Sequence, residues 1–82
     1  MPDFHYVFIL EFLAEPGRFY SGLTEDLSAR LKVHNNGDIS HTAKYAPWRI
    51  KSAVAFRDHP RASAFERYLK TASGRAFAKK RL

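Results

Sequence analysis

The chain contains no cysteine among its 82 residues, which excludes a disulfide framework and any metal site built on thiolates. A chain without disulfides is compatible with a reducing compartment, so we expect a cytoplasmic protein. No apolar run approaches the ~20 residues that a membrane-spanning helix needs. The first residues, MPDFHY, also lack the basic stretch and apolar run of a secretory signal peptide. These absences predict a protein that is not embedded in a membrane.

Acidic residues are scarce as well. The 8 Asp and Glu are outnumbered by 14 Lys and Arg, which gives a formal net charge of +6. A small domain this basic suits a polyanionic partner, and nucleic acid is the leading candidate. An anionic membrane surface is the weaker candidate, because no segment joins a strong apolar face to a lysine-rich one. The alternative is a basic surface without any such partner.

Three segments have the composition of β-strands. Residues 5–12, HYVFILEF, are apolar on both faces, which is typical of a central strand covered on both sides. Residues 19–23, FYSGL, follow a Pro-Gly turn signal and form the second strand of a hairpin. Residues 49–57, RIKSAVAFR, alternate and predict a third strand. The alternation places four side chains on one face: Ile50, Ser52, Val54 and Phe56.

A short amphipathic helix is predicted between the second and third strands. Its N-cap is Thr24, and the sequence Asn-Asn-Gly at residues 35–37 ends it, because Asn and Gly tolerate the left-handed conformation. Leu27 and Leu31 lie four residues apart and define its buried face. A further short helix fits residues 40–44.

The last third of the chain is predicted to be helical. A helix begins at Asp58 as N-cap, and Ser73-Gly74 ends it. Residues 75–82, RAFAKKRL, form a terminal basic helix or a frayed tail. The order β-β-α-(α)-β-α-α predicts an α+β fold in which a three-stranded central β-sheet is flanked by helices, as a single domain over residues 1–82.

Two polar residues fall on the buried face of the first helix. At about 100° per residue, Arg30 and His34 lie within roughly 60° of Leu27. One interpretation is structural: Arg30 extends along the edge of the apolar face and His34 packs half-buried. The other is that both line a cleft between this helix and the preceding strand.

Two further residues carry groups suited to chemistry. Tyr20 lies two residues before Gly22, whose missing side chain suggests that something approaches the backbone there. Glu66 lies beside the apolar stripe of the helix that begins at Asp58, which consists of Ala62, Phe65, Leu69 and Ala72. There it either pairs with Lys70 at i,i+4 or holds a hard cation such as Mg²⁺. Phosphodiester cleavage needs a group that activates water, a cation beside the phosphate and a metal on the leaving oxygen. Composition and spacing do not show that these groups converge.

The chain resembles a GIY-YIG nuclease domain, in particular the small members similar to the N-terminal nuclease module of the excinuclease subunit of bacterial nucleotide excision repair. The resemblance covers nearly the whole chain. Its tripeptides are weakly specific, but their order and spacing relative to the later motif residues are typical of the family. The matching residues are Tyr6, Val7 and Phe8 at the first tripeptide, Tyr20, Ser21 and Gly22 at the second, and then Arg30, His34 and Glu66.

The resemblance implies a metal-dependent DNA endonuclease, linked to DNA repair or processing, with a mixed or antiparallel sheet. It implies that Tyr20 positions or activates the attacking water and that Arg30 steadies the charge of the phosphate. Glu66 would hold one weakly bound Mg²⁺ or Mn²⁺. His34 stands where some relatives contact the phosphate or assist proton transfer. DNA is the expected partner, and the basic residues expected to bind its backbone are Lys32, Lys44, Arg75, Lys79, Lys80 and Arg81.

The chain departs from the family pattern at the first tripeptide. Phe8 stands where the family has a tyrosine, so the ring is kept and the hydroxyl is lost. The position after Gly22, often basic in relatives, is Leu23. These departures keep two alternatives open: a nucleic-acid-binding module that kept the fold and lost turnover, and a basic structural or partner-binding protein.

Overall fold

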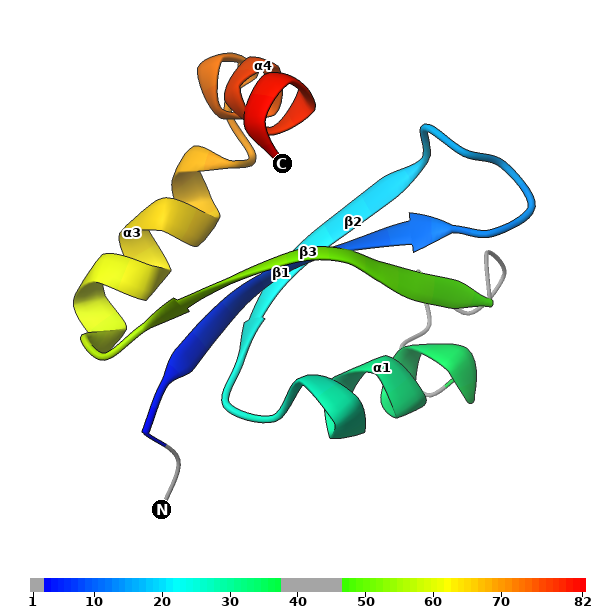
Figure 1. The fold of residues 1–82 in the computed structure, drawn as a ribbon, viewed down its shortest axis with the longest axis horizontal. Coiled ribbons are helices and arrows are strands. Elements are labelled where there is room, and N and C mark those ends of the chain that lie inside the picture. The colour runs from blue at the N-terminus through cyan, green and yellow to red at the C-terminus, as the bar shows by residue number, and fades with distance from the viewer. Residues whose placement is uncertain (1–2, 38–46) are drawn as a thin grey trace.

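In a computed structural model, which describes residues 3–37 and 47–82, the core element is a three-stranded antiparallel sheet (Figure 1). Strand β1 (His5–Phe12) lies in the middle, with β2 (Phe19–Thr24) on one side and β3 (Trp48–Phe56) on the other. Both neighbours pair with β1 in antiparallel register. The central position predicted for residues 5–12 is therefore confirmed.

Helices cover both faces of this sheet. Helix α1 (Leu27–Asn35) lies on one face, and α3 (His59–Tyr68) and α4 (Ala72–Arg81) lie on the other (Figure 1). The predicted α+β class, with a three-stranded sheet flanked by helices, is confirmed. The short helix predicted at residues 40–44 lies outside the described residues. Within the described part of the chain, no helix is long and apolar enough to cross a membrane.

The core is divided into two apolar clusters by the sheet. Val7 and Ile9 point toward α3 and α4, where they pack with Ala62 and Leu69. On the other face, Phe8 and Leu10 pack with Trp48, against Leu27 and Leu31 of α1. Alternate residues of β1 thus serve opposite layers, because successive side chains of a strand point to opposite faces. This is why residues 6–10 of β1 are apolar without interruption.

A register shift in β3 corrects the predicted alternation. Ile9 lies opposite Ser52 and Leu10 lies opposite Ile50, so Lys51 is an extra residue with no opposite partner on β1. Such a bulge re-aims the side chains around it. Ile50 therefore packs in the cluster under α1 while Phe56 packs under α3, although the sequence places them on one face.

The start of α1 differs from the prediction, whereas its end agrees: the helix ends at Asn35, Asn36 is the C-cap, and Gly37 is left-handed with φ 79°. Asp26 is the N-cap, and its carboxylate accepts a hydrogen bond from Ala29 N at 3.0 Å. Thr24, the predicted cap, ends β2 instead, and its hydroxyl accepts a hydrogen bond from Asp26 N at 3.1 Å. At the other end, the Asn35 amide donates to Trp48 O at 3.0 Å and accepts from Trp48 N at 2.6 Å. Asn35 therefore ties α1 to the start of β3 as well as ending the helix.

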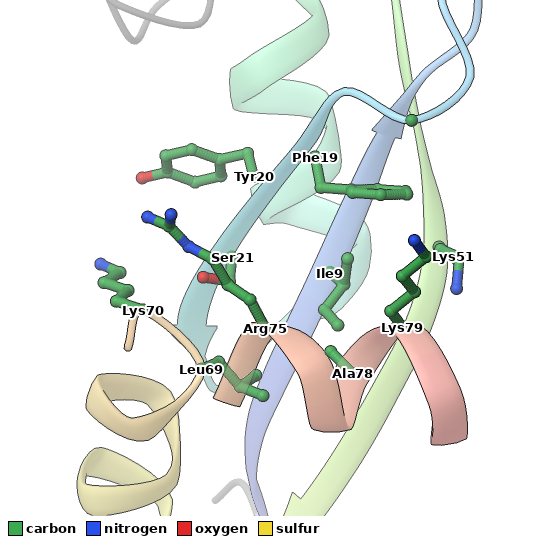
Figure 2. A pocket seen from close by; sticks show the side chains of 11 residues that line it. Ile9, Phe19, Tyr20, Ser21, Lys51, Leu69, Lys70, Arg75, Ala78 and Lys79 are labelled. Atoms are coloured by element: carbon green, nitrogen blue, oxygen red, sulfur yellow. The ribbon is translucent and has the colours of Figure 1, made fainter. Parts of the chain in front are cut away.

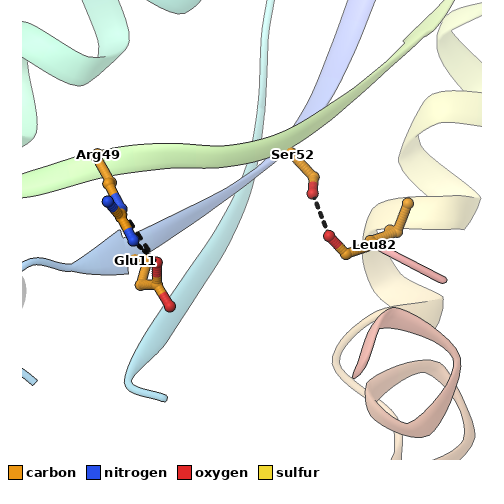
Figure 3. Close-up of polar contacts among 4 residues, drawn as sticks. All are labelled: Glu11, Arg49, Ser52 and Leu82. Carbon is orange, nitrogen blue, oxygen red and sulfur yellow. Dashed lines mark hydrogen bonds and ion pairs between the residues drawn. The ribbon is translucent and has the colours of Figure 1, made fainter. Parts of the chain in front are cut away.

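The predicted stop at Ser73-Gly74 is wrong. Helix α3 ends at Tyr68, and Gly74 lies in the first turn of α4, whose N-cap hydroxyl on Thr71 accepts from Gly74 N at 3.0 Å. At the far end of α4, Ser52 Oγ donates to Leu82 O at 2.6 Å (Figure 3). Both ends of α4 are thus fixed to the rest of the domain.

We expect Gly74→Ala to destabilise the domain by about 3 kcal/mol, the upper end of the usual cost of overpacking. A Cβ on Gly74 would overlap the backbone carbonyl group of Tyr68, with the carbonyl carbon only 2.5 Å away. Backbone atoms cannot rotate aside as a side chain can, so α4 must shift. The free energy of unfolding in urea measures the effect. Ser73→Ala, one residue earlier on an exposed position, should change it by less than about 0.5 kcal/mol. Equal values for the two variants would contradict the tight contact.

Candidate functional site

Tyr20 and His34 lie in ring contact with each other. Tyr20 lies on the edge strand β2 and His34 on α1, and their ring centroids are 4.8 Å apart. His34 is 0% exposed and also lies edge-on to Phe8, at 6.3 Å between centroids. The imidazole is therefore held by aromatic packing between the two tripeptide motifs. The prediction of a half-buried His34 underestimated its burial.

Arg30 lies on α1, one turn before His34, and is half-buried. Its Nε is fully shielded from solvent and, within the described part of the chain, has no hydrogen-bond partner. A buried donor without a partner costs about 1–3 kcal/mol. The side chain of Arg30 is thus partly buried, with its Nε inside the protein and not in water.

Glu66 comes from the other side of the sheet. It lies on α3, its side chain is 16% exposed, and its carboxylate pairs with Lys70 Nζ at 2.5 Å. The predicted i,i+4 pair with Lys70 is therefore formed. Within residues 3–37 and 47–82, no group of three His, Cys, Asp or Glu is arranged to hold a metal ion. Among these residues, an ion at Glu66 would therefore meet fewer than three such side chains, and water or a phosphate would complete its coordination.

The edge strand β2 gives access to both faces. The ring of Tyr20 packs in the cluster under α1, yet Tyr20 also lines a groove of about 910 Å³ between the sheet and α4. In Figure 2, the hydroxyls of Tyr20 and Ser21 lie on the same side of this groove as the guanidinium of Arg75 and the amine of Lys70. Tyr20 thus connects the α1 face, with Arg30 and His34, to the groove on the α3–α4 face.

The two tripeptide motifs meet at one position of the β1–β2 register. Phe8, the last residue of the first tripeptide, lies opposite Gly22, the last residue of the second. A Cβ on Gly22 would lie 2.6 Å from Cζ at the tip of the Phe8 ring. The group that approaches the backbone at Gly22 is therefore the Phe8 ring itself. A tyrosine hydroxyl at position 8 would extend from this tip, beyond Gly22.

The predicted basic residues do not form a single patch. Lys32 is exposed on α1, whereas Arg75 and Lys79 line the groove on the opposite face. Lys80 and Arg81 are exposed at the end of α4. Lys44 lies outside the described residues.

The groove also contains residues that sequence reasoning missed. Phe19, Lys51 and Lys70 line it together with the predicted Arg75 and Lys79. They come from β2, β3 and the end of α3, so no local pattern joins them. Neither Phe19 nor Lys51 has a local signal. Aromatic residues are common in strands, where they usually pack, and the orientation of Lys51 follows from the bulge.

Comparison with known proteins identifies the class. The sequence matches the GIY-YIG catalytic domain over residues 4–81. It is 35% identical to a UPF0213 protein of Halalkalibacterium halodurans over 72 residues, which cover 87% of this chain and 74% of the relative. It is 36% identical to a UPF0213 protein of Lacticaseibacillus paracasei over 67 residues, which cover 80% of this chain and 73% of the relative.

The chain belongs to the GIY-YIG family, as a small single-domain member. The family is a nuclease superfamily, so the domain indicates nuclease activity in general and a nucleic acid as the class of substrate. Neither relative's name states an activity.

Proposed function

We propose that the protein is a metal-dependent DNA endonuclease that hydrolyses phosphodiester bonds at the edge strand β2, in DNA repair or processing. The observation that carries the proposal is the buried Nε of Arg30, which has no hydrogen-bond partner in the described part of the chain. It lies one helical turn from the His34–Tyr20 pair. A guanidinium donor that the described residues leave unsatisfied is suited to a phosphate, which it binds through charge-assisted hydrogen bonds.

Each candidate residue has a role in this proposal. Tyr20 orients the attacking water through its hydroxyl, and His34 fixes the Tyr20 ring by the 4.8 Å contact. Arg30 binds the scissile phosphate and stabilises the negative charge that grows on it in the transition state. Glu66 is the residue that would hold the metal.

The chemistry of Glu66 fits a hard divalent ion held weakly. Mg²⁺ binds proteins through one or two carboxylates and keeps several of its waters, so a single carboxylate is a sufficient protein ligand. Lys70 occupies one side of this carboxylate and competes with an ion for it. When bound, Mg²⁺ or Mn²⁺ would act as a Lewis acid that neutralises charge on the phosphate oxygens.

The second candidate function is a nucleic-acid-binding module of the same fold with weakened turnover. Phe8 favours it, because the ring tip over Gly22 carries no hydroxyl to bond the water or the phosphate. Tyr20, Arg30 and Glu66 favour the enzyme, because a binding module has no need of all three. A purely structural role requires none of them.

We expect the purified protein to cleave at least one of branched, nicked, single-stranded or double-stranded DNA with Mg²⁺ or Mn²⁺, and none with EDTA. Phe8→Tyr should increase the rate by about 10-fold or more, since a hydroxyl placed for proton transfer contributes typically 10²–10⁴-fold. Phe12→Tyr adds a hydroxyl to the same cluster, away from Gly22, and should leave the rate unchanged. Cleavage by the Phe8→Tyr variant and not by the parent would show that the parent is a nucleic-acid-binding module. Cleavage by neither protein would overturn the proposed activity.

A further inference from the structure

The groove between the sheet and α4 has a fixed shape. Its floor includes Ile9 and Ser21, and its wall includes Ala78 of α4 (Figure 2). Helix α4 is held at its start by the close approach of Gly74 to Tyr68 and at its end by the Ser52–Leu82 hydrogen bond. A ligand therefore meets a preformed surface and need not order it on binding.

The groove is strongly cationic. Four basic residues line it: Lys51, Lys70, Arg75 and Lys79. Within the described part of the chain, Lys70 forms an ion pair with Glu66, and the other three basic residues have no carboxylate partner.

The carboxylate of Glu11, which is on the strand beside Phe19, does not offset these positive charges. Glu11 lies opposite Phe19 in the register and shares its face of the sheet. Its carboxylate is bound by Arg49 at 2.7 Å and buried (Figure 3). The lining therefore keeps an excess of positive charge.

An exposed aromatic ring lies among these cations. Phe19 is 50% exposed, although it is in a strand whose other apolar residues pack into the core. Lys51 Nζ lies 5.6 Å from its ring centroid. An exposed ring flanked by cations is the arrangement by which proteins bind single strands: a base stacks on the ring and the backbone follows the charges.

We propose that this groove binds an unpaired segment of DNA, with one base stacked on Phe19 and the adjoining phosphates beside Lys51, Arg75 and Lys79. The occupant is a single strand because its bases expose their flat faces, whereas bases in a duplex stack on one another and offer only their edges. Phe19 and Tyr20 both line the groove, so a strand seated on Phe19 can extend along it toward the Tyr20 hydroxyl (Figure 2). The inference rests on the proposed function for the identity of the polymer, and it names the substrate class: DNA with an unpaired strand next to the cleaved bond.

The test compares binding of a short single-stranded oligonucleotide with binding of the duplex of the same sequence, by fluorescence anisotropy in EDTA. Phe19→Leu keeps an apolar side chain and removes the aromatic face. It should weaken single-strand binding by about 5- to 150-fold, the range that loss of one stacked base produces, and leave duplex binding unchanged. Phe19→Trp should retain the affinity, and its tryptophan emission should be quenched by the single strand. Unchanged single-strand binding in Phe19→Leu, or equal loss for both DNAs, would overturn the inference.

An exposed arginine of α3 supplies a matched control for the charges. Lys79 lines the groove, whereas Arg67 is exposed outside its lining. Lys79→Gln should lower the slope of log affinity against log salt for the single strand by about 0.7, the value for one fewer neutralised phosphate on a single strand. Arg67→Gln, with the same change in net charge, should leave this slope nearly unchanged. Equal slopes for the two variants would contradict the path along α4.

These results are separable from those for cleavage. Binding in EDTA requires neither the metal nor turnover, so a protein that cleaves nothing but loses single-strand affinity in Phe19→Leu refutes the activity and supports the groove. If the parent protein cleaves DNA, and the Phe19→Leu variant binds single strands as tightly as the parent, the activity is supported and the groove is refuted. A wild-type protein that binds no single strand at low salt overturns the groove outright.

Discussion

Glu66→Gln is expected to lower the rate of DNA cleavage at saturating DNA by about 10²–10³-fold, the loss typical when one electrostatic stabiliser of a transition state is removed. The substitution keeps the size of the side chain and removes the charge that would hold the metal. DNA binding should survive and become slightly tighter, because a negative group leaves the neighbourhood of a phosphate. Stability should change little: Lys70 is 58% exposed, and such an ion pair contributes about 0–1 kcal/mol.

Lys70→Gln is the matched control, because it breaks the same ion pair from the other side. If Glu66 serves only as the partner of Lys70, the two variants should behave alike in cleavage and in stability. If Glu66 holds the ion, Lys70→Gln frees its carboxylate. The Mn²⁺ concentration for half-maximal rate should then fall, while the rate at saturating DNA stays within a few-fold of the parent. Equal losses of cleavage rate in both variants would show that Glu66 serves only as the ion-pair partner of Lys70.

The layout of the fold was predictable where one strong pattern governed a segment. Residues 5–12 are apolar on both faces, and this composition alone places them in the middle of the sheet. The same holds for the face of α1: a period of about 100° sets Arg30 and His34 beside Leu27, and the structure buries His34 there. In both cases a single periodicity decides the result.

Other features depend on contacts between distant segments, and the sequence contains no local signal for them. The sequence of β3 alternates between its two sets of side chains straight through Lys51. The bulge there, which puts Ile50 and Ser52 on different faces of the sheet, therefore cannot be predicted from this pattern. Ser73-Gly74 has the composition of a helix end, but Gly74 is required by its contact with Tyr68. The groove joins Phe19, Lys51 and Lys79 across the whole length of the chain. The family motif thus names candidate residues, whereas the groove that surrounds some of them has no signal in the sequence.

Arg30→Met is expected to leave stability unchanged or raise it slightly, and to lower cleavage by about 10²–10³-fold. These two effects together test the assignment more sharply than either alone. Methionine keeps an unbranched stem that packs against the cluster under α1, and it removes the buried Nε that lacks a partner in the described part of the chain. Removing an unsatisfied donor relieves a cost of about 1–3 kcal/mol, which offsets the loss of whatever packing the guanidinium group itself provides.

Lys32→Met is the control for this experiment, because it removes one positive charge from an exposed position on the same helix. Both variants reduce the net charge equally, so a general loss of attraction to DNA would affect both to the same extent. We expect cleavage at saturating DNA to be lost only in Arg30→Met, with similar melting temperatures for the two proteins. A marked fall in melting temperature in Arg30→Met alone would show that Arg30 is held for packing. Arg30 would then not be the residue that binds the phosphate.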